Sequence, residues 1–295
     1  MHISICICSY KRPEMLRKLL SKLRGLETRD RFTFSVVVSD NDPEESGRPV
    51  IEQFSTDYPV HIDYVTEPRR NISHARNAAL ARATGEAIAF IDDDEWPEPD
   101  WLINHVLALQ RPGVAGALGP VRPHFDQPPP AWVIRGRFCE RPEHETGFVM
   151  SFPECRTGNV LFKREILDGV DPVFLPEFGT GGGDVNFFSR MMRNGHKFIW
   201  CNQAVVYEDV PPSRWTRRFM LSRALLRGAN FWEHPGWHVR AVVNSLIAVP
   251  AYTILLPFLF VAGHHHFMKC LVKWCNHAAR LLGLFGVKPV KQRMM

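Results

Sequence analysis

The chain has 295 residues, 45% of them hydrophobic and 23% charged, so it is long and apolar enough to bury a sizeable core. This composition excludes a disordered chain and a small disulfide-stapled scaffold. The net charge of +5 is a property of the tail, because Glu233 is the last acidic residue and seven Lys or Arg follow it. The tail is mostly aliphatic and aromatic and has no dense basic run, which favours a membrane surface over nucleic acid as its partner.

The first ninety residues alternate between strand and helix patterns. Short β-rich runs predict strands, and leucine-spaced or alanine-rich stretches predict the helices between them. This alternation predicts an α/β fold with a mostly parallel sheet covered by helices. Ligands of such sheets gather beyond the carboxyl ends of the strands, which is where Ser9, Asp40 and Asp92 to Asp94 lie.

The cysteines and the amino terminus indicate the compartment. Seven cysteines are scattered along the chain without a CxxC pair, so we expect reduced thiols. Residues 1–8 have no basic segment leading into an apolar one, and the first strand begins at once. We therefore expect the catalytic part to lie in the cytoplasm.

The middle of the chain is less regular. Residues 111–154 are Pro-rich, which predicts long surface loops or a lid. A strand is expected near 158–162, and a glycine cluster at 179–183 precedes Asp184. Residues 185–194 then predict a helix, and 197–207 predict one strand.

Three successive carboxylates, Asp92, Asp93 and Asp94, follow the apolar run that ends at Ile91. They would repel one another if merely clustered, but they suit a hard divalent cation that bridges a substrate diphosphate. Oxygen ligands indicate Mg²⁺ or Mn²⁺. The alternative is a solvated acidic turn.

The segment around this triplet resembles glycosyltransferase family 2. An apolar strand ends in an Asp-x-Asp motif, and a Pro and the aromatic-Leu pair Trp101-Leu102 follow. Residues 4–13, 36–41 and 71–80 are similar to the family's first strand and loop, its second strand, and the helix before the metal motif. The resemblance implies the GT-A fold, a Rossmann-like, mostly parallel sheet with helices on both faces. It covers roughly the first 230 residues, so we expect a catalytic domain at 1–232, and the composition of the tail predicts a membrane-associating helical region at 233–295.

The resemblance also implies roles for individual residues. Those expected to bind a nucleotide-sugar are Ser9, Arg12, Asp40, Arg76, Asp92 and Asp93. Asp94 and Asp92 are expected to hold the metal. Other interpretations remain open for three of them: Ser9 as a helix cap, Asp40 as part of a turn, and Arg76 as a solvated helix charge.

Asp184 is the candidate catalytic base. Transfer with inversion needs a carboxylate to take the proton from the attacking acceptor hydroxyl. The position of Asp184 resembles the family's Glu-Asp base motif, although Gly183 replaces the usual Glu. The alternative role is an N-cap for a helix that starts at Val185.

Two further groups lie downstream. By the resemblance, Glu208 or Asp209 stands where many relatives carry a metal-binding His. We expect Glu208, or Asp209 in its place, to complete the metal shell, with an exposed acidic turn as the alternative. Arg214, Arg217 and Arg218 are expected to share one helix with Arg223 and Arg227 and to grip a diphosphate. A basic helix face on anionic lipid is the alternative.

The tail contains an uncharged stretch, residues 241–263, that is long enough to span a bilayer. Pro250 and Pro257 interrupt it and both flanks are basic, which favours a re-entrant or in-plane pair of helices with 267–285 as the amphipathic partner. A single crossing and a soluble core hairpin are the alternatives. His264 to His266 are expected in an interfacial loop.

Together these features predict an inverting, metal-dependent enzyme that moves a hexose from a nucleotide-sugar. The donor is expected to be a UDP-sugar and the acceptor a lipid-linked saccharide at the cytoplasmic face of a bacterial inner membrane. A nucleotidyltransferase is one alternative, although residues 9–13 lack the Gly-rich loop typical of that class. A catalytically silent membrane adaptor that keeps a nucleotide pocket is another.

Overall fold

The computed structural model describes residues 1–179, 181–233, 239–287 and 289–290. The chain folds into two compact units, each made of two segments. The first unit contains Met1–Arg122 and Arg141–Glu208, and the second contains Pro123–Glu140 and Asp209–Met295. This grouping differs from the predicted division after residue 232. The catalytic role of 1–232 and the membrane role of 233–295 stay predictions.

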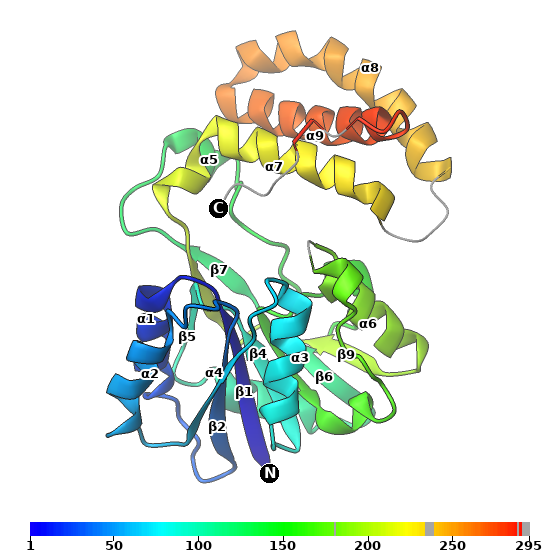
Figure 1. Ribbon diagram of the computed structural model, residues 1–295. Coiled ribbons are helices and arrows are strands. Elements are labelled where there is room, and N and C mark those ends of the chain that lie inside the picture. The colour runs from blue at the N-terminus through cyan, green and yellow to red at the C-terminus, as the bar shows by residue number, and fades with distance from the viewer. Residues whose placement is uncertain (180, 234–238, 288, 291–295) are drawn as a thin grey trace. The chain divides into compact units, whose positions relative to one another are not determined.

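The first unit is built on a mixed, mostly parallel sheet. Seven strands of the described chain form it in the order β3-β2-β1-β4-β8-β6-β9 (Figure 1). Their bounds are β1 His2–Ser9, β2 Thr33–Asp40, β3 Ile62–Thr66, β4 Ala87–Ile91, β6 Val114–Leu118, β8 Asn159–Lys163 and β9 Lys197–Trp200. β8 runs antiparallel to both β4 and β6, and every other recorded pairing in this sheet is parallel.

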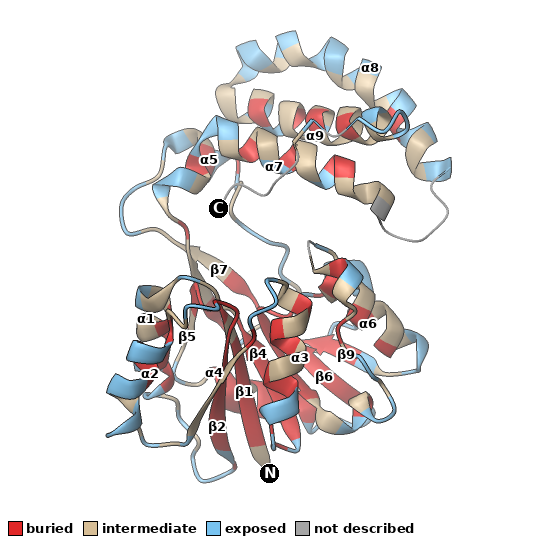
Figure 2. Cartoon of the chain, viewed as in Figure 1, coloured by how far each residue is buried: buried red, intermediate tan, exposed pale blue. Residues whose placement is uncertain are grey.

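Helices cover both faces of this sheet, as predicted. The helices of the unit are α1 Pro13–Leu23, α2 Arg48–Ser55, α3 Ile72–Arg82, α4 Trp101–Leu109 and α6 Gly183–Arg193. α1, α2 and α4 contribute to one apolar core, in which Leu16 and Trp101 are fully buried. α3 and α6 contribute to the other, which contains Ala79 and Phe187. The strands between these two cores are mostly buried (Figure 2).

The strand register brings distant residues to one edge of the sheet. Ser9 at the end of β1 pairs with Asp40 at the end of β2. Ile91 at the end of β4 pairs with Asn159 at the start of the antiparallel β8. The acidic triplet that follows Ile91 therefore lies at the same edge as Ser9 and Asp40.

The segment from 111 to 154 contains more regular structure than expected. It holds β6, β7 (Val121–His124), α5 (Ala131–Arg135) and the short helix η1 (Phe152–Glu154). Beyond it, η2 (Arg164–Leu167) and η3 (Pro176–Phe178) lead towards α6.

Three expectations from the sequence can be checked directly. The predicted strand at 197–207 is two strands, β9 and β10 (Val206–Asp209), because the chain turns between them, and β10 joins β5 (Glu95–Pro97) and β7 in a second sheet. The helix after the glycine cluster begins at Gly183, not Val185. Its N-cap is Gly182 in the left-handed region (φ 84°), so Asp184 lies in the first turn and the N-cap interpretation is wrong. All seven cysteines are free thiols, as predicted.

The second unit is largely helical. It contains η4 Pro212–Trp215, α7 Arg217–Asn230, η5 Phe231–Glu233, α8 Val239–Ala262 and α9 His264–Gly283. α9 packs against both α7 and α8 (Figure 1). Pro250 and Pro257 lie inside α8 without ending it. Gly263 (φ 142°) joins α8 directly to α9, so His264 to His266 form the first turn of α9 and the predicted loop is wrong.

Candidate functional site

The acidic triplet lies at the carboxyl edge of the main sheet and is held by residues from β1 and the loop after it. Ser9 Oγ donates to Asp93 at 2.9 Å. Arg12 Nη1 donates to Asp93 at 3.0 Å and to Asp94 at 3.2 Å. The structure thus brings together four of the predicted site residues, from two segments that lie more than eighty positions apart in the sequence.

Glu95 belongs to the same cluster, although the sequence analysis did not single it out. Its side chain is buried, and its Oε1 has no hydrogen-bond partner among the described residues. Its Oε2 accepts from the main-chain N–H of Asp92 at 3.3 Å. A Cβ on Gly158 would lie 2.7 Å from Glu95 Oε1 and 3.0 Å from Asp92 Oδ2, so only glycine lets the start of β8 approach this closely.

The cluster disfavours its own ionisation. Burial raises the pKa of Asp92 to about 7; Arg76 opposes this shift and Asp94 adds to it. Burial likewise raises the pKa of Asp93 to about 6, against the lowering effect of Arg12. The pKa of Glu95 lies well above its ordinary value because of burial and the nearby Asp92. Buried carboxylates in such a cluster are stabilised by a cation.

A divalent ion fits this edge of the sheet. Asp94 and Asp92 would hold it, because Mg²⁺ and Mn²⁺ prefer carboxylate oxygens. The ligand atoms of Asp92, Asp94 and Glu208 do not all converge within 4.8 Å, whereas those of His124, Asp126 and Asp209 do, alone among the described residues. An ion bound through one or two carboxylates and completed by substrate phosphates and water needs no closed cage.

These pKa shifts predict that metal binding and stability depend on pH in opposite directions. Because the ion competes with the protons of Asp92 and Asp93, we expect Mn²⁺ affinity to rise on the order of tenfold between pH 5.5 and 7.5, with proton release. The folded pKa values exceed the unfolded value, so the stability that these groups contribute to the metal-free protein is present below about pH 4 and is lost as pH rises through 6 to 7. Calorimetric titration in two buffers measures both affinity and released protons. Equal affinity at both pH values would contradict the prediction.

Asp184 lies in the first turn of α6 and is held in place by two residues from other elements. Arg76 Nη1, from α3, approaches its Oδ1 to 2.7 Å. Thr157 Oγ1, just before β8, donates to the same oxygen at 3.1 Å. The Arg76 side chain is only 10% exposed and its guanidinium lies 5.3 Å from the centre of the Phe174 ring. Arg76 thus positions Asp184, a role that the sequence did not indicate. The predicted contact of Arg76 with nucleotide stays a prediction.

Asp40 is fully buried, and its two oxygens already accept protein hydrogen bonds. Oδ1 accepts from the main chain of Asp42 at 3.0 Å, and Oδ2 accepts from Gly47 at 2.7 Å and from Tyr64 Oη at 2.9 Å. This geometry favours the turn interpretation. The contact of Asp40 with nucleotide stays a prediction.

Glu208 lies opposite Glu95 in the pairing of β10 with β5. Its Oε2 accepts from Arg141 Nη2 at 2.6 Å. Arg141 therefore compensates the charge of Glu208 beside the acidic cluster, and the metal role of Glu208 stays a prediction. No sequence signal marked Arg141, because its partner is 67 residues away.

The three arginines expected to bind diphosphate belong to the second unit. Arg217 and Arg218 open α7, where Thr216 caps the helix by accepting from the main chain of Phe219 at 3.1 Å. Arg214 lies in η4, so it does not share one helix with the other arginines as expected. The diphosphate role of all three stays a prediction.

Comparison with solved structures identifies the fold class as GT-A. A mannosyltransferase of Pyrobaculum calidifontis solved with GDP-Man and Mn²⁺ aligns over 96% of this chain and 87% of its own, with a TM-score of 0.66 and 19% identity. TarS of S. aureus, solved with UDP-GlcNAc, aligns over 97% and 92% with a TM-score of 0.57 and 15% identity.

The chain belongs to glycosyltransferase family 2, whose model matches residues 4–170. It is 32% identical to the succinoglycan biosynthesis protein ExoM of Rhizobium meliloti, over 99% of this chain and 96% of that protein. It is also 25% identical to the glycosyltransferase AglE of Haloferax volcanii, over 69% of this chain and 65% of that protein. The protein is thus a glycosyltransferase, as predicted, and the nucleotidyltransferase and adaptor alternatives lose their support.

Proposed function

We propose that the protein is an inverting, metal-dependent hexosyltransferase that extends a lipid-linked saccharide during assembly of a bacterial surface polysaccharide. One observation carries this proposal: Asp184, fixed by Arg76 and Thr157, is linked through the start of β8 to the acidic cluster around Asp92. The names of the relatives support the pathway class, since ExoM is described as a succinoglycan biosynthesis protein.

The chemistry follows from these residues. An Asp184 oxygen takes the proton of the acceptor hydroxyl as that oxygen bonds to the anomeric carbon and the bond to the donor's diphosphate breaks. Ser9 and Arg12 orient Asp93 and Asp94 towards the donor side. A divalent ion, when bound, neutralises the charge that develops on the leaving diphosphate.

A thermal-shift panel tests the donor site. UDP, GDP, dTDP and their common sugars are each added with and without Mn²⁺, and we expect one nucleotide, UDP, to raise Tm by about 5 °C or more only when metal is present. Asp94→Ala should lose this shift, because it removes a metal ligand. The exposed Asp57→Ala serves as the matched control and should keep it. A folded wild type that no nucleotide stabilises would overturn the proposed function.

The second unit supports attachment to a membrane. α8 has 24 residues, and an 18-residue window within it has a mean hydropathy of 2.1, so the helix is long and apolar enough to cross a bilayer by length and composition. Only Ser245 is buried along it, and its Oγ lies 2.9 Å from His277 Nδ1 of α9. Figure 2 shows α8 as exposed or intermediate along most of its length. The exposed large apolar side chains of the helix are Val239, Val243, Leu246, Ile247, Ile254, Leu255, Phe258, Phe260 and Val261. α8 and α9 therefore form a packed hairpin whose outer surface is apolar.

We infer that this hairpin enters one leaflet from the cytoplasmic face and returns to it. α9 folds back along α8 and carries Lys269, Lys273 and Arg280, which a single crossing would have to translocate. Phe258→Glu should reduce flotation with phosphatidylglycerol-containing vesicles by tenfold or more, because a charge in the apolar face is costly to bury in lipid. Leu107→Glu, at an exposed site on α4, is the control. Unchanged flotation of Phe258→Glu would contradict the hairpin.

A further inference from the structure

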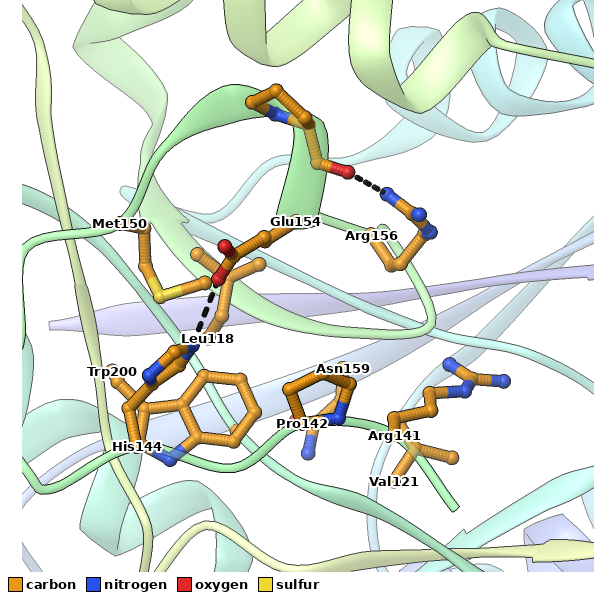
Figure 3. Close-up of a pocket in the computed structure, with 12 residues that line it drawn as sticks. Leu118, Val121, Arg141, Pro142, His144, Met150, Glu154, Arg156, Asn159 and Trp200 are labelled. Carbon is orange, nitrogen blue, oxygen red and sulfur yellow. Dashed lines mark hydrogen bonds and ion pairs between the residues drawn. The ribbon is translucent and has the colours of Figure 1, made fainter. Parts of the chain in front are cut away.

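A pocket of about 200 Å³ opens at the same edge of the main sheet, on the far side of β8 from the nucleotide-facing residues (Figure 3). It lies where β6 and β9 end and β8 begins, and its lining includes Leu118, Asn159 and Trp200 from those strands. Other lining residues come from the segment 141–156, which overlaps the predicted loop region 111–154. None of the predicted site residues lines this pocket.

The wall of the pocket is held by main-chain pairing. Gly147 donates to the Trp200 carbonyl at 2.8 Å, and Trp200 donates to the Phe148 carbonyl at 2.8 Å. Val149 forms an antiparallel bridge with Ile199. This segment is therefore an added edge on β9, and the pocket is formed before any ligand arrives.

The lining combines an apolar floor with a charged rim. Leu118, Met150 and Trp200 are buried and form the floor. On the rim, His144 Nε2 lies 2.8 Å from Glu154 Oε2, and the His144 ring stacks on Phe148 at 4.2 Å.

Arg156 supplies hydrogen-bond donors at the same rim. Its Nη1 donates to the main-chain carbonyl of Pro153 at 2.9 Å (Figure 3). It also donates to the main-chain carbonyl of Cys155. Its remaining N–H groups make no hydrogen bond to a described residue and are available to a ligand. A sugar ring matches such a pocket, since its C–H face is apolar and its hydroxyls both donate and accept.

The pocket also lies close to the reacting groups. Thr157, which holds Asp184, and Gly158, where a Cβ would meet Asp92 and Glu95, stand between the lining residues Arg156 and Asn159. Arg141 lines the pocket as well and binds Glu208 at 2.6 Å. A ligand here would sit beside the base and across the acidic cluster from Ser9 and Arg12, where an acceptor must approach if the diphosphate leaves on the other side.

We propose that this pocket binds a hexose unit of the acceptor saccharide, with the ring against the apolar floor and hydroxyls bonded to Glu154 and Arg156. This inference rests on the proposed transferase function. It assigns recognition of the acceptor to the first unit of the protein. The part of the acceptor that is recognised there is its sugar, not its lipid.

Binding of methyl β-glycosides of glucose, galactose and their disaccharides tests the proposal. Saturation-transfer NMR and calorimetry are run on the full-length protein with UDP and Mn²⁺, in a detergent without a sugar headgroup. Wild type should bind at least one glycoside, and Glu154→Gln and Arg156→Ala should each weaken it by about tenfold or more, because each loses a charge-assisted hydrogen bond. Arg31→Ala, an exposed arginine just before β2 at the opposite edge of the sheet, should change nothing.

The outcomes separate the two proposals. Glu154→Gln and Arg156→Ala should keep the nucleotide-dependent thermal shift, which shows that the donor half is folded. If wild type is stabilised by a nucleotide but binds no glycoside, or if both variants bind as wild type does, the acceptor pocket is overturned and the transferase proposal stands. If wild type responds to no nucleotide, the proposed function itself fails.

Discussion

Replacing Asp184 with Asn should lower the transfer rate by about a thousandfold, because the acceptor hydroxyl loses the carboxylate that takes its proton. Asn is nearly the same size as Asp and can still accept from Thr157, so the first turn of α6 should persist. The expected loss lies in kcat, while KM for the nucleotide-sugar should stay within about threefold. Steady-state kinetics with a radiolabelled donor measures both.

The ion pair with Arg76 requires a control for folding. Asp184→Asn leaves that guanidinium, which is only 10% exposed, without its carboxylate, so Tm and the nucleotide-dependent shift must be measured on the same sample. Asp168→Asn, at an exposed carboxylate directly after η2, is the matched control and should transfer at the wild-type rate. A folded Asp184→Asn protein with more than a tenth of wild-type activity would remove Asp184 from the mechanism.

Replacing Asn159 with Ala should destabilise the first unit by about 3 to 5 kcal/mol, because four buried polar groups each lose a hydrogen bond. Asn159 Oδ1 accepts from Trp101 Nε1 and from His105 Nε2, both at 2.8 Å. Its Nδ2 donates to the carbonyls of Pro120 at 2.9 Å and Ala204 at 2.8 Å. Burial lowers the pKa of His105 to about 4, so the ring is neutral and cannot offset the loss by taking up a proton near pH 7.

This effect can be followed by urea unfolding of the full-length protein. Trp101 is one of eight tryptophans that contribute to the intrinsic fluorescence, and the urea midpoint of that signal should fall together with Tm. Asn194→Ala, at an exposed position after α6, should change stability by less than about 0.5 kcal/mol. An Asn159→Ala protein as stable as the control would show that the network contributes no net stability.

Much of the fold followed from local patterns. The alternation of strand and helix predicted the parallel sheet and its two helical layers, and the acidic triplet after Ile91 predicted a candidate site at its carboxyl edge. Local patterns misplaced elements where the chain turns without a glycine or proline signal. The prediction of one strand over 197–207 is wrong for this reason. The turn at 202–204, which separates the two strands, contains neither glycine nor proline.

The sequence by itself determined the class of protein and the position of the acidic triplet, because these depend on residues adjacent in the chain. Only the tertiary structure joined Arg76 to Asp184, Arg141 to Glu208 and Asn159 to Trp101, since these contacts span 58 to 108 positions. Likewise, the pocket beyond β8 exists only because residues 147–149 pair with β9. Contacts between distant segments are selected by how the sheet and its layers pack, and no spacing within the sequence encodes that packing.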